Sequence, residues 1–106
     1  MMSKSPITTN PDWLHNEHAG EMLVAEFMEP VGLNADALAR ALQVDRSRVE
    51  AVIAGERPVD AELDLRLTRY FGMSEGFFLR LQNRHDLIEA KRALNGALDQ
   101  IAPRAA

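Results

Sequence analysis

Two short predicted helices with only three residues between them are the feature that most restricts how this chain can fold. Asn34 is a good N-cap, which predicts a helix over 35–42. After the junction, Asp45 is placed to cap a second helix over 46–54. Two helices at this spacing are typical of a helix-turn-helix, which the sequence places at 34–54.

The two predicted helices have distinct buried and exposed faces. The small side chain of Ala39 lets the second helix cross close to the first. The side chains predicted to be buried are Leu38, Leu42, Val44, Val49, Val52 and Ile53. The opposite side of the second helix holds Ser47, Glu50, Ala51 and Ala54, with Arg46 and Arg48 at its flanks. Such a face suits a recognition helix in the DNA major groove, while a solvated helix in a small bundle fits the spacing equally well.

Helices are also predicted on both sides of this motif. One begins at Ala19 and is ended by Pro30 and Gly32. Another is capped by Asp60 and spans 61–71.

The C-terminal part of the sequence predicts one long helix. Ser74 is placed to cap it, the polar run 82–86 could kink it, and Leu94 lies near its end. A last turn is predicted over 97–101. Because no run of alternating β-branched residues occurs, the predicted fold class is all-α with about five helices.

The composition fits one globular domain with a tail. The chain has 106 residues, of which 46% are hydrophobic and 26% are charged. The absence of cysteine excludes disulfides, a thiolate nucleophile and cysteine-based metal sites, and it favours a cytoplasmic location. No apolar run suits a signal peptide or a membrane span, so no membrane partner is expected.

The net charge of −4 argues against a general binder of polyanions. Residues 1–30 carry one Lys against five acids, and this acidic part is either a solvated helix face or a docking surface for a basic partner. Residues 1–17 are predicted to form a flexible arm before a domain over 18–106. Trp13 and Leu14 in this arm either pack back on the domain or anchor a partner.

No catalytic constellation or cofactor motif is found. His15 and His18 could form a weak metal site with nearby glutamates, but a helix cap or a surface pair explains them more simply. His85 is interpreted as a solvated or interhelix residue. No catalytic residue, metal or cofactor is therefore predicted.

Several segments together resemble one known family. They are His18-Ala-Gly-Glu-Met-Leu, the stretch from Glu29 to Leu42, Val44 to Val59, Leu67 to Asn83, and Asp86-Leu87. With these segments, residues 18–94 resemble the HigA-type (VapI-related) addiction-module antitoxins of the xenobiotic-response-element helix-turn-helix family.

This resemblance implies a five-helix, lambda-repressor-like DNA-binding domain and a homodimer that represses its own promoter at a palindromic operator in double-stranded DNA. In complete modules it also implies that the protein neutralises a RelE/HigB-like mRNA-cleaving toxin, a small basic protein. The alternatives are a stand-alone transcriptional regulator without a toxin, or a toxin-holding module that binds DNA weakly.

The site residues follow from this interpretation. Arg46, Ser47, Glu50 and Ala51 are predicted to face base edges, and Arg48, Arg57 and Arg40 to lie nearer phosphates. The predicted dimer contact consists of Phe77, Phe78, Leu81, Ile88 and Leu94.

Three positions depart from the family pattern. Ala35 stands where the family often has Gln, Gln43 replaces the usual Gly, and Glu56 stands where Lys is frequent. Gln43 occupies a point where a left-handed backbone is common. Each of the three changes removes or opposes a phosphate contact. Either DNA affinity is weak, or the operator contacts have shifted to the arginines named above.

Overall fold

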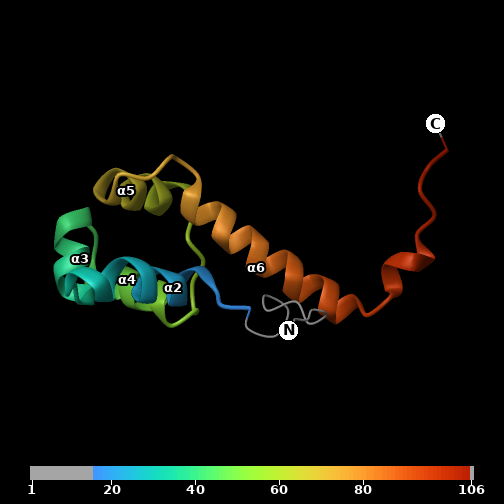
Figure 1. Cartoon of the computed structure of the whole chain (residues 1–106), viewed down its shortest axis with the longest axis horizontal. Helices are drawn as coiled ribbons and strands as arrows, with labels where there is room; N and C mark the ends of the chain where they lie inside the picture. The colour runs from blue at the N-terminus through green and yellow to red at the C-terminus, as the bar shows by residue number, and fades with distance from the viewer. Residues whose placement is uncertain (1–15, 106) are drawn as a thin grey trace, which may run out of the picture.

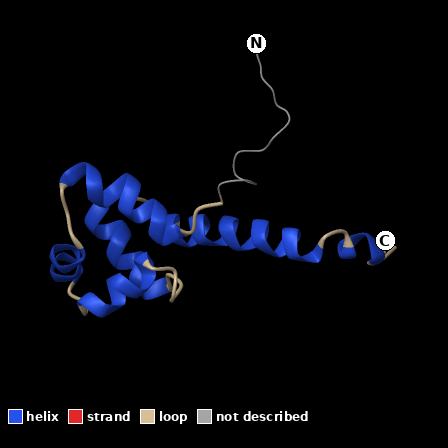
Figure 2. Ribbon diagram, turned by 90° about the horizontal axis from the view of Figure 1, so that it is seen from below, coloured by secondary structure: helices blue, strands red, loops and turns tan. Residues whose placement is uncertain are grey.

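Every regular element in residues 16–105, the part of the chain that this computed structural model describes, is helical (Figure 2). The α-helices are α2 (Ala19–Met22), α3 (Ala35–Leu42), α4 (Arg46–Ile53), α5 (Ala61–Phe71) and α6 (Phe77–Leu94). A π-helix, η1 (Leu23–Met28), and two 3-10 helices, η2 (Glu29–Val31) and η3 (Ala97–Gln100), complete the set. The prediction of an all-α fold with five helices is confirmed for these residues.

Local capping defines most of the helix boundaries. The side chain of Asn34 accepts a hydrogen bond from the Ala37 N–H at 2.8 Å, and that of Asp60 accepts one from the Leu63 N–H at 2.9 Å. Asp45 occupies the N-cap position of α4 but makes no capping hydrogen bond with its side chain. The predicted boundaries of α3 and α5 are therefore confirmed, and α4 ends one residue earlier than predicted.

The first predicted helix is one continuous run made of α2, η1 and η2. Pro30 has no N–H to donate, so a regular α-helical ladder cannot continue through it. The run tightens into η2 and ends at Gly32, where φ is +70°. The predicted end is confirmed, whereas the π-helical segment was not predicted.

The core lies between α2 to α5 and the first turns of α6, which begins at the edge of this helical body (Figure 1). Phe78 and Leu38 are fully buried, and Leu67 is nearly so. The ring of Phe27 lies 5.1 Å from that of Phe78 and 5.1 Å from that of Phe71, in tilted geometries that aromatic pairs prefer. The aromatic residues thus join η1 to α5 and α6.

Gly20 allows α2 to lie almost in contact with the backbone of α4. A Cβ atom at this position would lie 2.0 Å from the Val52 carbonyl oxygen, a distance that no side chain can occupy. Ala39 of α3, the helix that α4 crosses, is also buried.

The start of α6 is capped by a buried carboxylate from α5. Asp64 accepts hydrogen bonds from the N–H groups of Gly76, Phe78 and Leu79, at 2.7, 2.9 and 3.1 Å. These donors belong to the first turn of α6 and would otherwise be unsatisfied. The predicted cap, Ser74, is wrong, because the capping group comes from another helix.

Helix α6 continues without interruption through residues 82–86, so the kink allowed for there is absent. Its first turns pack into the core, and its outer half projects away from the other helices (Figure 1). Phe78 cannot serve as a dimer contact, because it is completely enclosed within its own chain.

Replacing Asp64 with Ala is expected to lower the free energy of unfolding by at least about 3 kcal/mol, because three N–H groups would lose a charged acceptor in a buried setting. Asp64→Asn should also destabilise, since its amide nitrogen cannot accept the third bond. Urea denaturation measures both effects. The exposed acid Asp86 provides the control, and a loss no larger than that of Asp86→Ala would contradict the capping role.

Candidate nucleic-acid interface

Helix α4 presents one face to the core and one to solvent. Val49 and Val52 are each 2% exposed, whereas Ser47, Glu50 and Ala54 lie on the surface. Val44 and Ile53, predicted to be buried, are partly buried, and so is Ala51. The exposed face of α4 is therefore made of small residues around Glu50 and the exposed Arg46 that pairs with it.

The turn between α3 and α4 is tight and left-handed. Gln43 has a φ of +61°, the conformation for which glycine is usual, so the sequence expectation for this position is confirmed. The Val44 N–H donates to the Ala39 carbonyl at 3.0 Å. Arg66 of α5 donates to the Leu42 carbonyl at 2.9 Å and satisfies the end of α3. The role of Arg66 was missed, since nothing near it in sequence signals this contact.

Two of the predicted DNA-contacting arginines are paired with acids on their own helices. Arg46 lies 3.5 Å from the Glu50 carboxylate, and Arg40 lies 3.2 Å from Asp36. Both arginine side chains are mostly exposed, so these pairs contribute little stability and can be exchanged for other partners. Arg57 is exposed, and its charge is one of the causes that lower the pKa of Asp60.

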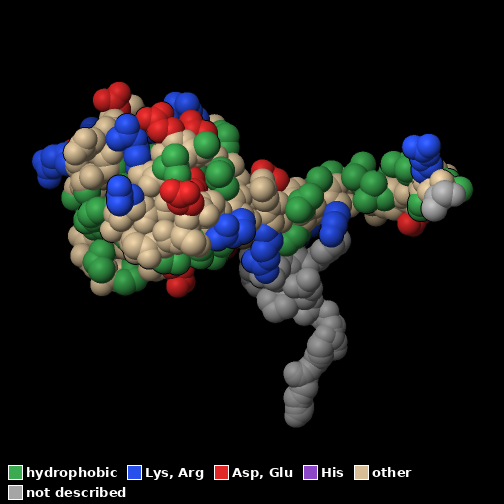
Figure 3. Space-filling view, turned by 90° about the horizontal axis from the view of Figure 1, so that it is seen from above, with side chains coloured by type: hydrophobic (Ala, Val, Ile, Leu, Met, Phe, Trp, Pro, Cys, Tyr) green, Lys and Arg blue, Asp and Glu red, His purple; other side chains and the backbone are tan. Residues whose placement is uncertain are grey.

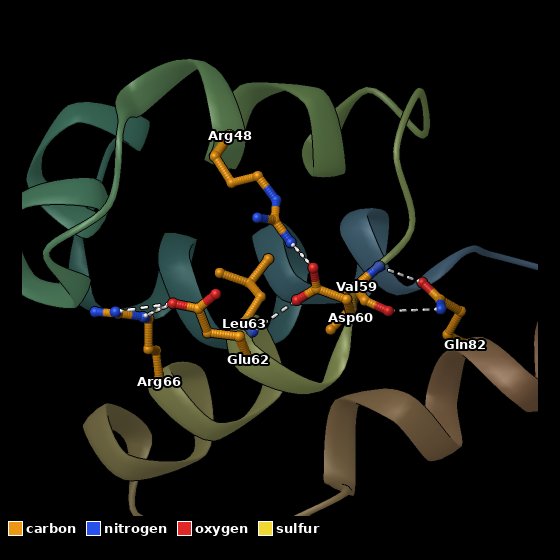
Figure 4. A network of polar contacts seen from close by, with 7 residues as sticks. All are labelled: Arg48, Val59, Asp60, Glu62, Leu63, Arg66 and Gln82. Carbon is orange, nitrogen blue, oxygen red and sulfur yellow. Dashed lines mark hydrogen bonds and ion pairs between the residues drawn. The ribbon is translucent and has the colours of Figure 1, made fainter.

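Arg48 is placed differently from the prediction. Its side chain is 19% exposed and points inward, with one Nη 2.6 Å from the carboxylate of Asp60 (Figure 4). Arg48 precedes the buried Val52 by four residues, so it lies at the edge of the buried face. This spacing from Val52 is the sequence feature that could have predicted the inward position of Arg48. Arg48 therefore joins α4 to the start of α5 and is not positioned as a phosphate contact.

Asp60 links three parts of the site. Its carboxylate accepts the Leu63 N–H and also pairs with Arg48. The bond from Leu63, the contact with Arg48 and the charge of Arg57 lower the pKa of Asp60 below its usual range. Just before it, the backbone of Val59 is bound on both sides by the side-chain amide of Gln82. The Gln82 nitrogen donates to the Val59 carbonyl at 2.8 Å, and its oxygen accepts from the Val59 N–H. Figure 4 shows these contacts from α4 through the linker to α6.

The histidines have structural roles. The His18 ring accepts from the N–H groups of Gly20 and Glu21, and the Glu21 carboxylate accepts from the His18 N–H in return, forming a capping box. His85 contacts the Asn16 carbonyl at 3.0 Å. The cap interpretation of His18 is confirmed. His85, expected to be a solvated or interhelix residue, is partly buried and lies against the residues that lead into α2. Within residues 16–105 no group of three or more ligating side chains could hold a metal ion.

Asn16 fastens the beginning of the described chain to α6. Its side chain donates to the His85 carbonyl at 2.9 Å and to the Glu89 carboxylate at 2.8 Å. The bond from Asn16 is the main cause of a lowered pKa of Glu89. Trp13, Leu14 and His15 lie outside the described residues.

The surface combines mixed charge with an apolar region. Figure 3 shows acidic and basic side chains close together over the helical body, and hydrophobic side chains gathered along the part that projects from it. The large exposed apolar residues of this projection are Leu87, Leu94, Leu98 and Ile101. Ile88 is partly buried, and Phe77 and Leu81 pack against the core.

The crossing of α3 and α4, the left-handed turn and the exposed face of α4 define a helix-turn-helix domain. No protein-family model matches the sequence. Virulence-associated protein I of Dichelobacter nodosus is 41% identical to it over 75 residues, which make up 71% of this chain and 69% of that protein.

Solved structures of related proteins also match this chain. A Pseudomonas aeruginosa protein in complex with 18 bp of its operator DNA matches with a TM-score of 0.80 and 34% identity, covering 85% of this chain and 96% of that one. The Pseudomonas aeruginosa antitoxin HigA with the higBA promoter matches with a TM-score of 0.76 and 33% identity, covering 84% and 98%. The chain belongs to the HigA-type family of helix-turn-helix antitoxins and transcriptional regulators.

Among the helices of residues 16–105, none combines the length and the apolar character needed to cross a membrane.

The lowered pKa of Asp60 predicts a pH-dependent contribution to stability. Folding favours the charged carboxylate, so the contribution is present at neutral pH and is lost as the pH falls below about 4. Asp60→Asn keeps a capping oxygen for Leu63 and removes the charge that pairs with Arg48. Since Asp60 is half exposed, the free energy of unfolding of the wild-type protein should exceed that of this variant by no more than about 1 kcal/mol at pH 7.

Urea denaturation at pH 7 and at pH 3 measures this difference. The lowered pKa of Glu89 is common to both proteins and cancels in the comparison. A difference between the two proteins that stays constant over this pH range would contradict the assignment.

Proposed function

We propose that this protein is an antitoxin that binds operator DNA in its own promoter as a homodimer and represses it. The observation that carries the proposal is the exposed face of α4, where small side chains surround Glu50 while Val49 and Val52 fix the helix to the core. A helix with such a face can lie in the major groove, because the small side chains allow a close approach and the long, exposed Arg46 side chain can reach the base edges.

The base-facing residues in this proposal are Arg46, Ser47, Glu50 and Ala51. Arg57 and Arg40 are assigned to phosphates, and Arg48 is removed from the set because Asp60 engages it. Because acidic side chains outnumber basic ones and the net charge is −4, the protein should have little affinity for DNA of unrelated sequence. Specific contacts must therefore provide much of its binding to an operator.

The proposed dimer contact is the outer half of α6. Of the five residues predicted for it, Ile88 and Leu94 lie in this half, and the exposed Leu87 belongs with them. A helix-turn-helix protein of this size reads two half-sites about 34 Å apart, which requires two copies related by a two-fold axis. An exposed apolar stripe on a projecting helix is suited to such a contact.

The proposed toxin is a small basic protein of the RelE/HigB-like, mRNA-cleaving kind, neutralised in the cytoplasm. The acidic excess of residues 1–30 suits a basic partner, and we assign Trp13 and Leu14 in the arm over 1–17 to this contact. The domain over 18–106 then provides DNA binding and dimerisation. A neighbouring reading frame for a small basic protein would support the joint role.

Arg46→Ala and Arg57→Ala are expected to affect DNA binding differently. The first should weaken operator binding by about 1 to 3 kcal/mol and relax the sequence preference, because it removes a base contact. The second should weaken binding to all DNA similarly and reduce the slope of log affinity against log salt by about one. Mobility-shift titrations on the DNA upstream of the gene, at two salt concentrations, measure both.

Arg104→Ala is the matched control, since Arg104 is exposed and belongs to the C-terminal segment, whose end lies far from α4 (Figure 1). Both test variants should keep the wild-type helicity. Operator binding by both test variants that equals that of Arg104→Ala would show that α4 and its following loop do not contact DNA.

Light scattering at tens of micromolar is expected to give a mass twice the 11.8 kDa of the chain. Leu94→Glu should shift this mass toward the monomer, because it places a charge in the proposed apolar contact. Leu65→Glu on α5 is the control, since Leu65 is exposed to a similar extent, 49% against 42%. A wild-type monomer, or equal effects of the two variants, would refute this dimer contact.

A further inference from the structure

Glu50 is the one acidic side chain within the proposed DNA-reading face. Its side chain is 54% exposed, and it lies between Ser47 and Ala54, whose small side chains do not shield it. If α4 enters the major groove by this face, the Glu50 carboxylate approaches the base edges together with the side chain of Arg46.

A carboxylate at this position restricts the base that it can meet. It can only accept hydrogen bonds, and most groups on the floor of the groove are also acceptors. The exposed donors are the N4 amino group of cytosine and the N6 amino group of adenine, and the adenine donor lies beside the acceptor N7. Cytosine is therefore the base that best satisfies Glu50, and any other base leaves a desolvated charge without a partner.

Arg46 can bind the guanine that pairs with this cytosine. Its Nε lies 3.5 Å from the Glu50 carboxylate, which is long for a hydrogen bond, so both groups keep bonding capacity for other partners. Arginine binds O6 and N7 of guanine through two hydrogen bonds. The ion pair holds a guanine-binding group and a cytosine-binding group side by side on α4.

We propose that Glu50 is a specificity-determining residue, which with Arg46 selects a cytosine·guanine pair in each half-site of the operator. This inference rests on the proposed function and extends it from DNA binding to the identity of one base pair. It also gives Glu50 a role on a surface where the binding of phosphates alone would favour lysine and arginine.

The test measures base preference, using the DNA upstream of the gene and a set of its single base-pair substitutions. In fluorescence anisotropy the wild-type protein is expected to favour cytosine at one position of each half-site by about 10- to 100-fold. Glu50→Gln should shift the preference at that position toward adenine, because an amide can bond both N6 and N7. Glu50→Ala should abolish the preference there.

Glu56→Gln is the matched control, because it makes the same change of charge at an exposed residue just beyond α4. It should strengthen binding to all sequences and keep the wild-type preference. Retained binding with an unaltered preference in both Glu50 variants would overturn the inference and leave the proposed function in place. Failure of the wild-type protein to bind any of these DNA molecules would overturn both.

Discussion

The buried carboxylate of Asp64 is the interaction on which the arrangement of the helices depends. It is 1% exposed, it comes from the first turn of α5, and it satisfies three N–H groups at the start of α6. The position of α6 then brings Phe78 into the core and Gln82 to the linker that follows α4. Without this cap, the first turn of α6 would present unsatisfied donors to a hydrophobic interior, which is unfavourable enough to displace the helix.

The sequence predicted the parts of the fold that local chemistry determines. Asn34 and Asp60 cap helices through bonds to residues three positions away, so the start of α3 and of α5 could be found within a short window. The cap of α6 could not, because Asp64 precedes its donors by 12 or more residues and only the packed fold brings them together. For the same reason the contact between Arg48 and Asp60 was not foreseen, and Arg48 was interpreted as a surface arginine.

In the candidate site too, the features set by neighbouring residues could be predicted, and the contacts between distant residues could not. The exposed face of α4 follows from helical periodicity, so the positions of Ser47 and Glu50 agree with the sequence. The left-handed backbone at Gln43 agrees as well, although the residue is not glycine, and Arg66 provides part of the explanation by bonding to the carbonyl just before it. Contacts between helices, rather than the propensity of any one helix, compensate for the unfavourable turn residue.

The two hydrogen bonds between Gln82 and Val59 have a mechanical consequence. They attach the segment leaving α4 to a point on α6, so the direction of α4 is fixed relative to the long axis of α6. In a pair of molecules joined through α6, the length and direction of α6 would set the distance between the two copies of α4. One residue inserted in α6 beyond Gln82 would turn its outer half by about 100° and lengthen it by about 1.5 Å. The separation of two recognition helices would thus depend on residues that never approach DNA.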